Sequence, residues 1–120
     1  LFERFMTVMD AAYAQVRAGA TLGDVGRAAI AANDGVVPWL PHFYLAHGVV
    51  LESAEMPMIG TDLGQAFDDG YVLQPGLVLV FEPVIWEDGV GSYRAEEICA
   101  VTETGWRHIG GGHGYPPYRP

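Results

Sequence analysis

Lysine is absent from this sequence, so its positive charge comes from six arginines alone, set against fifteen acidic residues. The net charge of −9 makes nucleic acids and anionic membrane surfaces poor partners for the chain. A single cysteine, Cys99, excludes an internal disulfide and removes the main argument for secretion. No apolar run reaches the roughly 18 residues that a membrane-spanning helix needs, and no signal peptide is evident. We therefore expect a cytoplasmic protein.

Apolar residues make up half of the 120 residues, which excludes a disordered chain and allows one hydrophobic core. The sequence shows neither an internal repeat nor a linker, so we predict a single domain over residues 1–120. The glycine- and proline-rich segment 110–120 is predicted to be a flexible tail. Because the sequence starts at Leu1 rather than at methionine, we expect a cut or processed chain.

The N-terminal third is predicted to be helical. Apolar residues recur at helical spacing from Phe2 to Val16, and Gly19 is predicted to end this helix. A second helix is predicted over residues 22–32. Thr21 and Asp24 stand at its start in a pattern similar to a capping box.

From Phe43 onward, the chain is predicted to form short strands joined by turns. The five apolar residues 77–81 are typical of a strand buried on both faces. Residues 87–89 mark a hairpin tip, the return strand is predicted over residues 94–102, and a last strand over 106–109. Two helices followed by an antiparallel sheet indicate an α+β fold.

Two glutamates stand in apolar company on the arms of the predicted hairpin. Glu82 shares a strand face with Val78 and Val80, and Glu96 has similar neighbours on the return strand. An unpaired buried carboxylate is costly, so each glutamate needs a cation. Arg94 is one candidate partner, and a divalent metal that holds both carboxylates is another. In a third interpretation, Glu82 reaches solvent at the end of its strand.

His47 is a candidate third ligand for such a metal. It precedes Gly48, a position where another backbone segment can approach closely. An imidazole together with two carboxylates suits Mn, Co, Fe or Zn.

Other residues have simpler interpretations. Glu97 is predicted to support the candidate ligands from the opposite strand face or to pair with an arginine, and Cys99 to be a small core residue. Three aromatic residues are predicted to pack in the core or to line a substrate pocket: Trp39, Phe43 and Tyr44.

Four segments, in order and with compatible spacing, resemble motifs of the pita-bread metallopeptidases. This family includes Xaa-Pro aminopeptidases, prolidases, methionine aminopeptidases and creatinase. The segments are His47 to Pro57, Leu73 to Pro83, Tyr93 to Glu97 and Val101 to Gly105. They are similar to the family's His-Gly-x-Gly-x-x-x-His-Glu-x-Pro, Leu-x-Pro-Gly-Met-Val with Glu-Pro, Arg-x-Glu-Asp and Val-Thr-x-x-Gly motifs. The resemblance covers nearly the whole chain and implies the C-terminal part of a pita-bread domain, with two helices packed on a curved antiparallel sheet.

The resemblance also implies a set of metal ligands. The family binds two divalent ions with two Asp, one His and two Glu, and the matching positions here are His47, Glu82 and Glu96. Glu82 would also act as the catalytic proton shuttle. The two aspartates would lie upstream of Leu1. We therefore expect a fragment of a hydrolase of the Xaa-Pro aminopeptidase or prolidase type. The complete enzyme would hold two Mn, Co, Zn or Fe ions and would act on small peptides. The fragment alone would be inactive and would bind one ion weakly or none.

Three departures from the motifs lower the expected activity. Ala54 replaces the family's substrate-contacting His, Val50 replaces the second Gly, and Ala46 replaces the Gly before the metal His. Loss of the hydrogen-bond donor at position 54 would typically lower the catalytic rate by a factor of about 10²–10³. His42 and Glu55 remain as candidate substrate-binding residues.

Two other functions stay open. The chain is alternatively a non-catalytic binding domain on the same scaffold, which Ala54 and Val50 favour, or a creatinase-like hydrolase with a non-peptide substrate. In either case, this piece alone would leave a sheet edge and an apolar face exposed. We therefore expect a partner, either the N-terminal part of the same polypeptide or a second copy of the chain.

Overall fold

The computed structural model describes residues 1–49, 51 and 54–110. Val50 and the tail beyond residue 110 lie outside the described residues, so the predictions made for them stay untested. The helices are α1 (Phe2–Tyr13), α2 (Leu22–Ala32) and α3 (Gln65–Gly70). The strands are β1 (Ala46–Val49), β2 (Ala54–Ile59), β3 (Val78–Phe81), β4 (Val84–Glu87), β5 (Gly91–Arg94), β6 (Glu97–Val101) and β7 (Trp106–His108). Within this part of the chain, no helix is long and apolar enough to cross a membrane.

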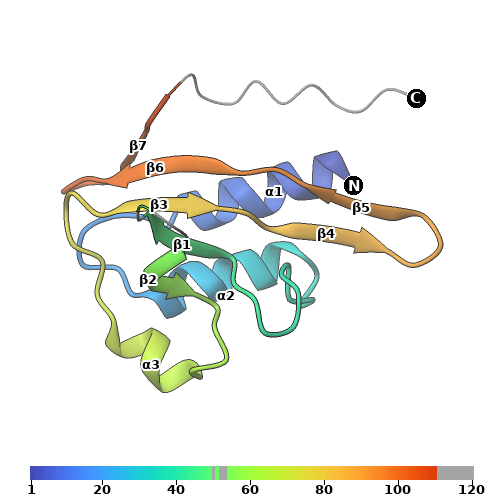
Figure 1. Cartoon of the computed structure of the whole chain (residues 1–120), viewed down its shortest axis with the longest axis horizontal. Helices are drawn as coiled ribbons and strands as arrows, with labels where there is room; N and C mark the ends of the chain where they lie inside the picture. Colours follow the sequence, from blue (N-terminus) through green and yellow to red (C-terminus); the bar gives the residue numbers. More distant parts are fainter. Residues whose placement is uncertain (50, 52–53, 111–120) are drawn as a thin grey trace.

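An antiparallel sheet of five strands, in the order β2-β1-β3-β6-β7, forms the centre of the molecule. A second sheet contains only β4 and β5. Figure 1 shows that β3 leads into β4 and that β5 leads into β6. These four strands therefore form one long hairpin, whose two arms each pass from the larger sheet to the smaller one. The predicted α+β fold is confirmed, with an antiparallel sheet that does not close.

The predicted return strand over residues 94–102 is interrupted. Val84 pairs with Arg94 in the smaller sheet, and Phe81 pairs with Glu97 in the larger one. Between these two ladders, one arm contributes Glu82 and Pro83. Because proline has no N–H to donate, a regular ladder cannot pass through this point. Glu82 and its counterpart on the other arm are therefore placed at the junction of the two sheets.

The first two helices form as expected, apart from one boundary. α1 ends at Tyr13, well before Gly19, which lies in the following loop with φ +85° and donates its N–H to the Leu73 carbonyl. α2 begins with the predicted capping box, in which Thr21 and Asp24 each bind the other's backbone N–H.

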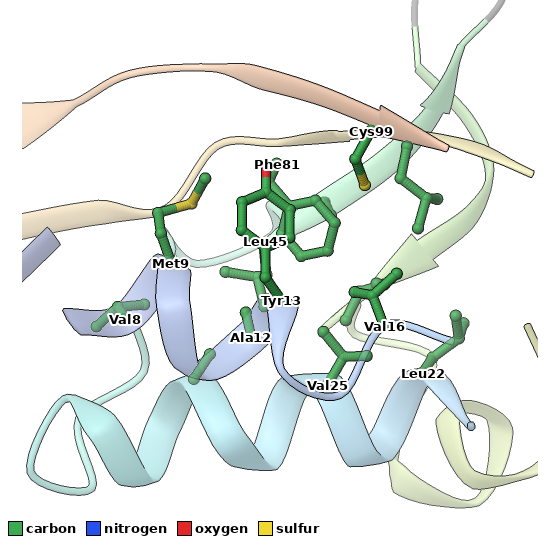
Figure 2. Packing of buried hydrophobic residues seen from close by; sticks show 14 of the residues in the cluster. Val8, Met9, Ala12, Tyr13, Val16, Leu22, Val25, Leu45, Phe81 and Cys99 are labelled. Atoms are coloured by element: carbon green, nitrogen blue, oxygen red, sulfur yellow. The ribbon is translucent and has the colours of Figure 1, made fainter. Parts of the chain in front are cut away.

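The core lies between these helices and one face of the larger sheet. Figure 2 shows Tyr13 of α1 close to Phe81 of the sheet, with Met9 and Cys99 on either side of them in the same core. Apolar side chains of α2, such as Val25, belong to the same core. Burial in this core is what holds α1, α2 and the sheet together.

The third helix is absent from the sequence-based prediction. α3 has only six residues, none of them buried, so no apolar stripe marks it in the sequence. Arg27 of α2 binds Asp69 of α3 at 2.5 Å. This contact joins residues that are far apart along the chain, which local sequence patterns cannot indicate.

The predicted strand over residues 77–81 forms as β3, and its last three residues are buried, whereas Leu77 and Val78 are half-buried. Leu79 and Phe81 are fully buried, and Val80, between them, is 7% exposed. Val80 pairs with His47 on one side and with Ile98 on the other. Because residues directly opposite one another share a sheet face, these three side chains form one row.

Candidate functional site

His47 and Glu82 lie side by side at the junction of the two sheets. His47 is on β1, and Glu82 directly follows β3, the strand next to β1. The Glu82 N–H donates to the Leu45 carbonyl at 2.9 Å, which ties Glu82 to the residue before β1. As a result, His47 Nε2 lies 3.3 Å from Glu82 Oε1.

The other ring nitrogen of His47 determines what this contact means. His47 Nδ1 is 2.6 Å from the Gly48 carbonyl oxygen. A carbonyl can only accept, so Nδ1 carries a proton and neutral His47 has its lone pair on Nε2. That lone pair and the Glu82 oxygen are both acceptors. Their close approach is favourable only with a proton or a cation between them.

Glu82 is a deeply buried carboxylate. It is 2% exposed, so the interpretation in which it reaches solvent is wrong. Burial raises the pKa of Glu82, and the positive charge of Arg94 opposes that rise. A buried charge of this kind requires a partner.

Arg94 supplies that partner and joins the two glutamates. Its Nη2 donates to Glu82 Oε2 and also to Glu96 Oε1, the latter at 2.8 Å. The prediction that Arg94 pairs with one of the glutamates is confirmed, and the structure extends it to both. The two carboxylates therefore meet across the hairpin, through one guanidinium nitrogen.

The donor chemistry of these residues fits a divalent ion. An imidazole and two carboxylates are the ligands expected for Mn, Co, Fe or Zn. Within residues 1–49, 51 and 54–110, however, no group of three His, Cys, Asp or Glu is close enough to hold a metal. The third candidate ligand, Glu96, is instead hydrogen-bonded to Arg94, which also bonds Glu82. The assignment of His47, Glu82 and Glu96 as metal ligands stays a prediction.

Two aromatic residues border this site. The rings of Phe43 and Tyr44 are stacked, with centroids 4.5 Å apart. The Tyr44 ring centroid is 5.2 Å from that of His47, and Arg94 Cζ is 5.8 Å from the centroid of Phe43. Burial raises the pKa of Tyr44, and the negative charge of Glu82 adds to this rise. Trp39 packs against the core and also lines two hollows away from Glu82. That Phe43 and Tyr44 line a substrate pocket stays a prediction.

The two candidate substrate-binding residues lie in different surroundings. His42 is exposed and pairs with Asp62, its Nδ1 lying 2.5 Å from Oδ2 of that residue. Glu55 is exposed on β2, opposite Gly48 in the strand register. The contacts found in the described part of the chain do not bring either residue to Glu82. Their roles in substrate binding stay predictions.

Glu97, the residue after Glu96, is the first residue of β6 and is buried. Tyr13 Oη donates to Glu97 Oε2 at 3.3 Å, and His108 Nδ1 lies 3.6 Å from the same oxygen. Sequence reasoning did not single out this pair. Its sequence signals are a tyrosine on the apolar stripe of α1 and a histidine in the last strand, and only the tertiary structure brings them together.

Comparison with known proteins agrees with this architecture. The model of metallopeptidase family M24 matches residues 1–103. An uncharacterized peptidase of Staphylococcus haemolyticus is 31% identical over 93 residues, which cover 76% of this chain and 24% of that protein. Dipeptidase PepE from Mycobacterium ulcerans has a TM-score of 0.71 at 28% identity, covering 89% of this chain and 28% of the other. Prolidase from Pyrococcus furiosus has the same TM-score and identity, covering 89% of this chain and 30% of the other.

The chain thus spans about a quarter of the curated relative it matches. The α+β architecture, predicted from the order of helices and strands, and the resemblance to the pita-bread enzymes, based on four sequence motifs, are both confirmed. The family match covers each of the three candidate ligand positions. This chain belongs to metallopeptidase family M24.

Proposed function

We propose that this chain is part of a metal-dependent hydrolase that cleaves Xaa-Pro bonds in small peptides, with His47, Glu82 and Glu96 as metal ligands. One observation carries the proposal. The lone-pair nitrogen of His47 lies 3.3 Å from an oxygen of the buried Glu82, an arrangement that calls for a shared cation or proton. The dipeptidase and prolidase names of two similar structures support the substrate class.

Glu82 is the residue to which we assign proton transfer. A bound Mn, Co, Zn or Fe ion would supply Lewis acidity and make water more acidic. Hydrolysis adds the water oxygen to the carbonyl carbon, breaks the C–N bond and delivers a proton to the proline nitrogen. Glu82 would take the proton from water on a carboxylate oxygen and pass it to that nitrogen. The wall formed by Phe43 and Tyr44 would hold the substrate against these groups.

We further propose that turnover requires more polypeptide than these 120 residues. The chain covers only about a quarter of the curated relative, and the family's two aspartate ligands have no counterpart in it. They would come from the N-terminal part of the same polypeptide or from a second copy. The cytoplasmic location expected from the sequence is part of this proposal.

Native mass spectrometry with Mn²⁺, on a polypeptide that contains this chain together with the remaining ligands, tests the ligand assignment. We expect the bound ion to be lost in His47→Ala and Glu82→Ala and to be retained in His42→Ala, a control that removes an exposed imidazole. The spectrum also reports any second copy. If wild type and His42→Ala bind no more metal than His47→Ala, the ligand assignment is wrong.

A hydrolysis assay then tests the reaction. An Xaa-Pro dipeptide is offered, with Mn²⁺ or Co²⁺, to a polypeptide that contains this chain together with the remaining ligands. Release of proline that disappears in Glu82→Ala supports the proposal. Metal binding without any hydrolysis contradicts the peptidase activity.

A non-catalytic binding domain is the second candidate. One specific observation favours it: the Arg94 guanidinium hydrogen-bonds both glutamates, so each carboxylate has a partner within the chain itself. Ala54, at the position of the family's substrate-contacting His, points the same way. Under this alternative, Glu82→Ala would lower the stability of the fold but would leave peptide binding intact. Under the enzyme proposal, the same substitution removes metal binding.

A further inference from the structure

One guanidinium nitrogen serves two carboxylates at the junction of the sheets. Arg94 Nη2 donates to Glu82, which is 2% exposed, and to Glu96, whose side chain is 56% exposed. The Arg94 side chain is itself 43% exposed and so borders solvent. A positive group that reaches in from the surface thus neutralises the innermost carboxylate of the site.

A guanidinium and a divalent ion are competitors for this position. Glu82 Oε1 faces His47, whereas Arg94 occupies Glu82 Oε2 and Glu96 Oε1. A divalent ion that joins Glu96 to His47 and Glu82 would have to enter the space between the carboxylates that the guanidinium now fills. Two positive groups held between the same carboxylates would repel each other strongly in a partly buried site. Only one of them can occupy the position at a time.

We propose that Arg94 is an internal cation that holds the space between Glu82 and Glu96 in the metal-free protein and must leave before a divalent ion can join all three ligands. Metal binding is then an exchange of one cation for another. Arg94 lowers the affinity of the site for every divalent ion. It thereby restricts the site to ions that bind carboxylate and imidazole strongly enough to displace it.

A displaced Arg94 side chain has an alternative contact nearby, the aromatic ring of Phe43. It is the last residue of β5, next to the interruption between β5 and β6. Its Cζ already lies 5.8 Å from the centroid of Phe43, whose ring is stacked on Tyr44. An aromatic face is a favourable contact for a guanidinium that has lost its carboxylates. The released side chain can reach this face without crossing the core, because it starts at the surface.

The exchange rests on the ligand assignment proposed above, and its test separates the two ideas. Mn²⁺ binding is measured by titration calorimetry on wild type, Arg94→Gln and Arg107→Gln, each in a polypeptide that contains this chain together with the remaining ligands. Arg107 is exposed on β7, so its substitution makes the same change in net charge away from the site. We expect Arg94→Gln to bind Mn²⁺ at least about tenfold more tightly than wild type, the effect of losing one charge-assisted competitor. Arg107→Gln should change the affinity less than about twofold, as expected for a distant, screened charge.

Each outcome is decisive. Equal or weaker binding by Arg94→Gln, with measurable binding by wild type, overturns the exchange and leaves the ligand assignment standing. An equal gain in both variants also overturns it, because the effect is then one of net charge. No binding by any of the three proteins overturns the ligand assignment, and the exchange with it.

A second measurement on wild type does not depend on a variant that folds. Zn²⁺, which is diamagnetic, is titrated into protein labelled with ¹⁵N-arginine and ¹⁵N-histidine, and the side-chain resonances are followed by NMR. We expect the Arg94 Nε–Hε signal and the His47 Nε2 signal to change over the same range of Zn²⁺ concentration. A change at His47 with an unmoved Arg94 signal overturns the exchange.

Discussion

Gly48→Ala is expected to destabilise the protein by displacing two strands beside the candidate site. A Cβ added at Gly48 would lie 2.8 Å from the Met56 carbonyl oxygen and 3.1 Å from that of Glu55. Carbon–oxygen contacts normally begin at about 3.3 Å, so β1 and β2 would have to separate by about half an ångström. The obstacle is backbone, which cannot rotate away as a flexible side chain can.

The expected magnitude is the difference between two opposing effects. Overpacking that forces a backbone shift typically costs about 1–3 kcal/mol. Replacing glycine by alanine also restricts the unfolded chain, which restores about 0.4–1 kcal/mol. We therefore expect the free energy of unfolding to fall by about 1–2 kcal/mol. The Gly48 carbonyl accepts from His47 Nδ1 at 2.6 Å, so the NMR signals of the imidazole should shift as well.

Urea unfolding, followed by the fluorescence of the three tryptophans, measures this change. Gly105→Ala is the matched control, because a Cβ there meets nothing within 4 Å and its φ lies outside the positive region. That substitution should be neutral or slightly stabilising. If Gly48→Ala is as stable as Gly105→Ala, the close approach of β2 to Gly48 is not a constraint and the reasoning is refuted.

Three further predictions concern α2 and the core. Gly26→Ala should raise the free energy of unfolding by about 0.5–1 kcal/mol, because it removes a glycine from a helix interior. The new Cβ meets only Ile59 Cγ2, at 3.9 Å. A loss of stability in urea unfolding would contradict this. Hydrogen bonds from Thr21 hold the pKa of Asp24 below its ordinary value of 3.8, so the stabilisation by Asp24 is present above that pH and fades as the pH falls through the lower pKa of the folded state. Asp24→Asn should therefore be less stable than wild type at pH 7, and the difference should disappear in acid; a difference independent of pH would refute the assignment. Burial raises the pKa of the Cys99 thiol to about 12, with a smaller contribution from the negative charge of Glu97, so iodoacetamide at pH 8 should label it only after unfolding; labelling of the native protein at the unfolded rate would show that the thiol is accessible.

Local patterns in the sequence determined most of the secondary structure. The helices over residues 2–13 and 22–32 follow from apolar periodicity and a capping box, and the strand at 78–81 from an apolar run. The hairpin tip near residue 89 follows from its turn residues. Each of these signals spans only a few neighbouring residues, so the physics that sets it is local and readable in one dimension.

The candidate ligands were also found from the sequence, because a carboxylate between apolar residues stands out and the motifs of a known family surround it. The sequence could not show which cation meets that carboxylate. Arg94, a divalent ion and solvent were all compatible with the local pattern around Glu82.

Only the tertiary structure excluded solvent and placed Arg94 against Glu82. Strand order places β1 beside β3 and so brings His47 to within 3.3 Å of Glu82, although 35 positions separate them. The interruption after β5 places Arg94 at the junction, where one nitrogen reaches both Glu82 and Glu96. α3 likewise meets a distant part of the chain, where Asp69 pairs with Arg27 of α2. These features depend on pairings between distant parts of the chain, and such pairings form only when the whole core is assembled.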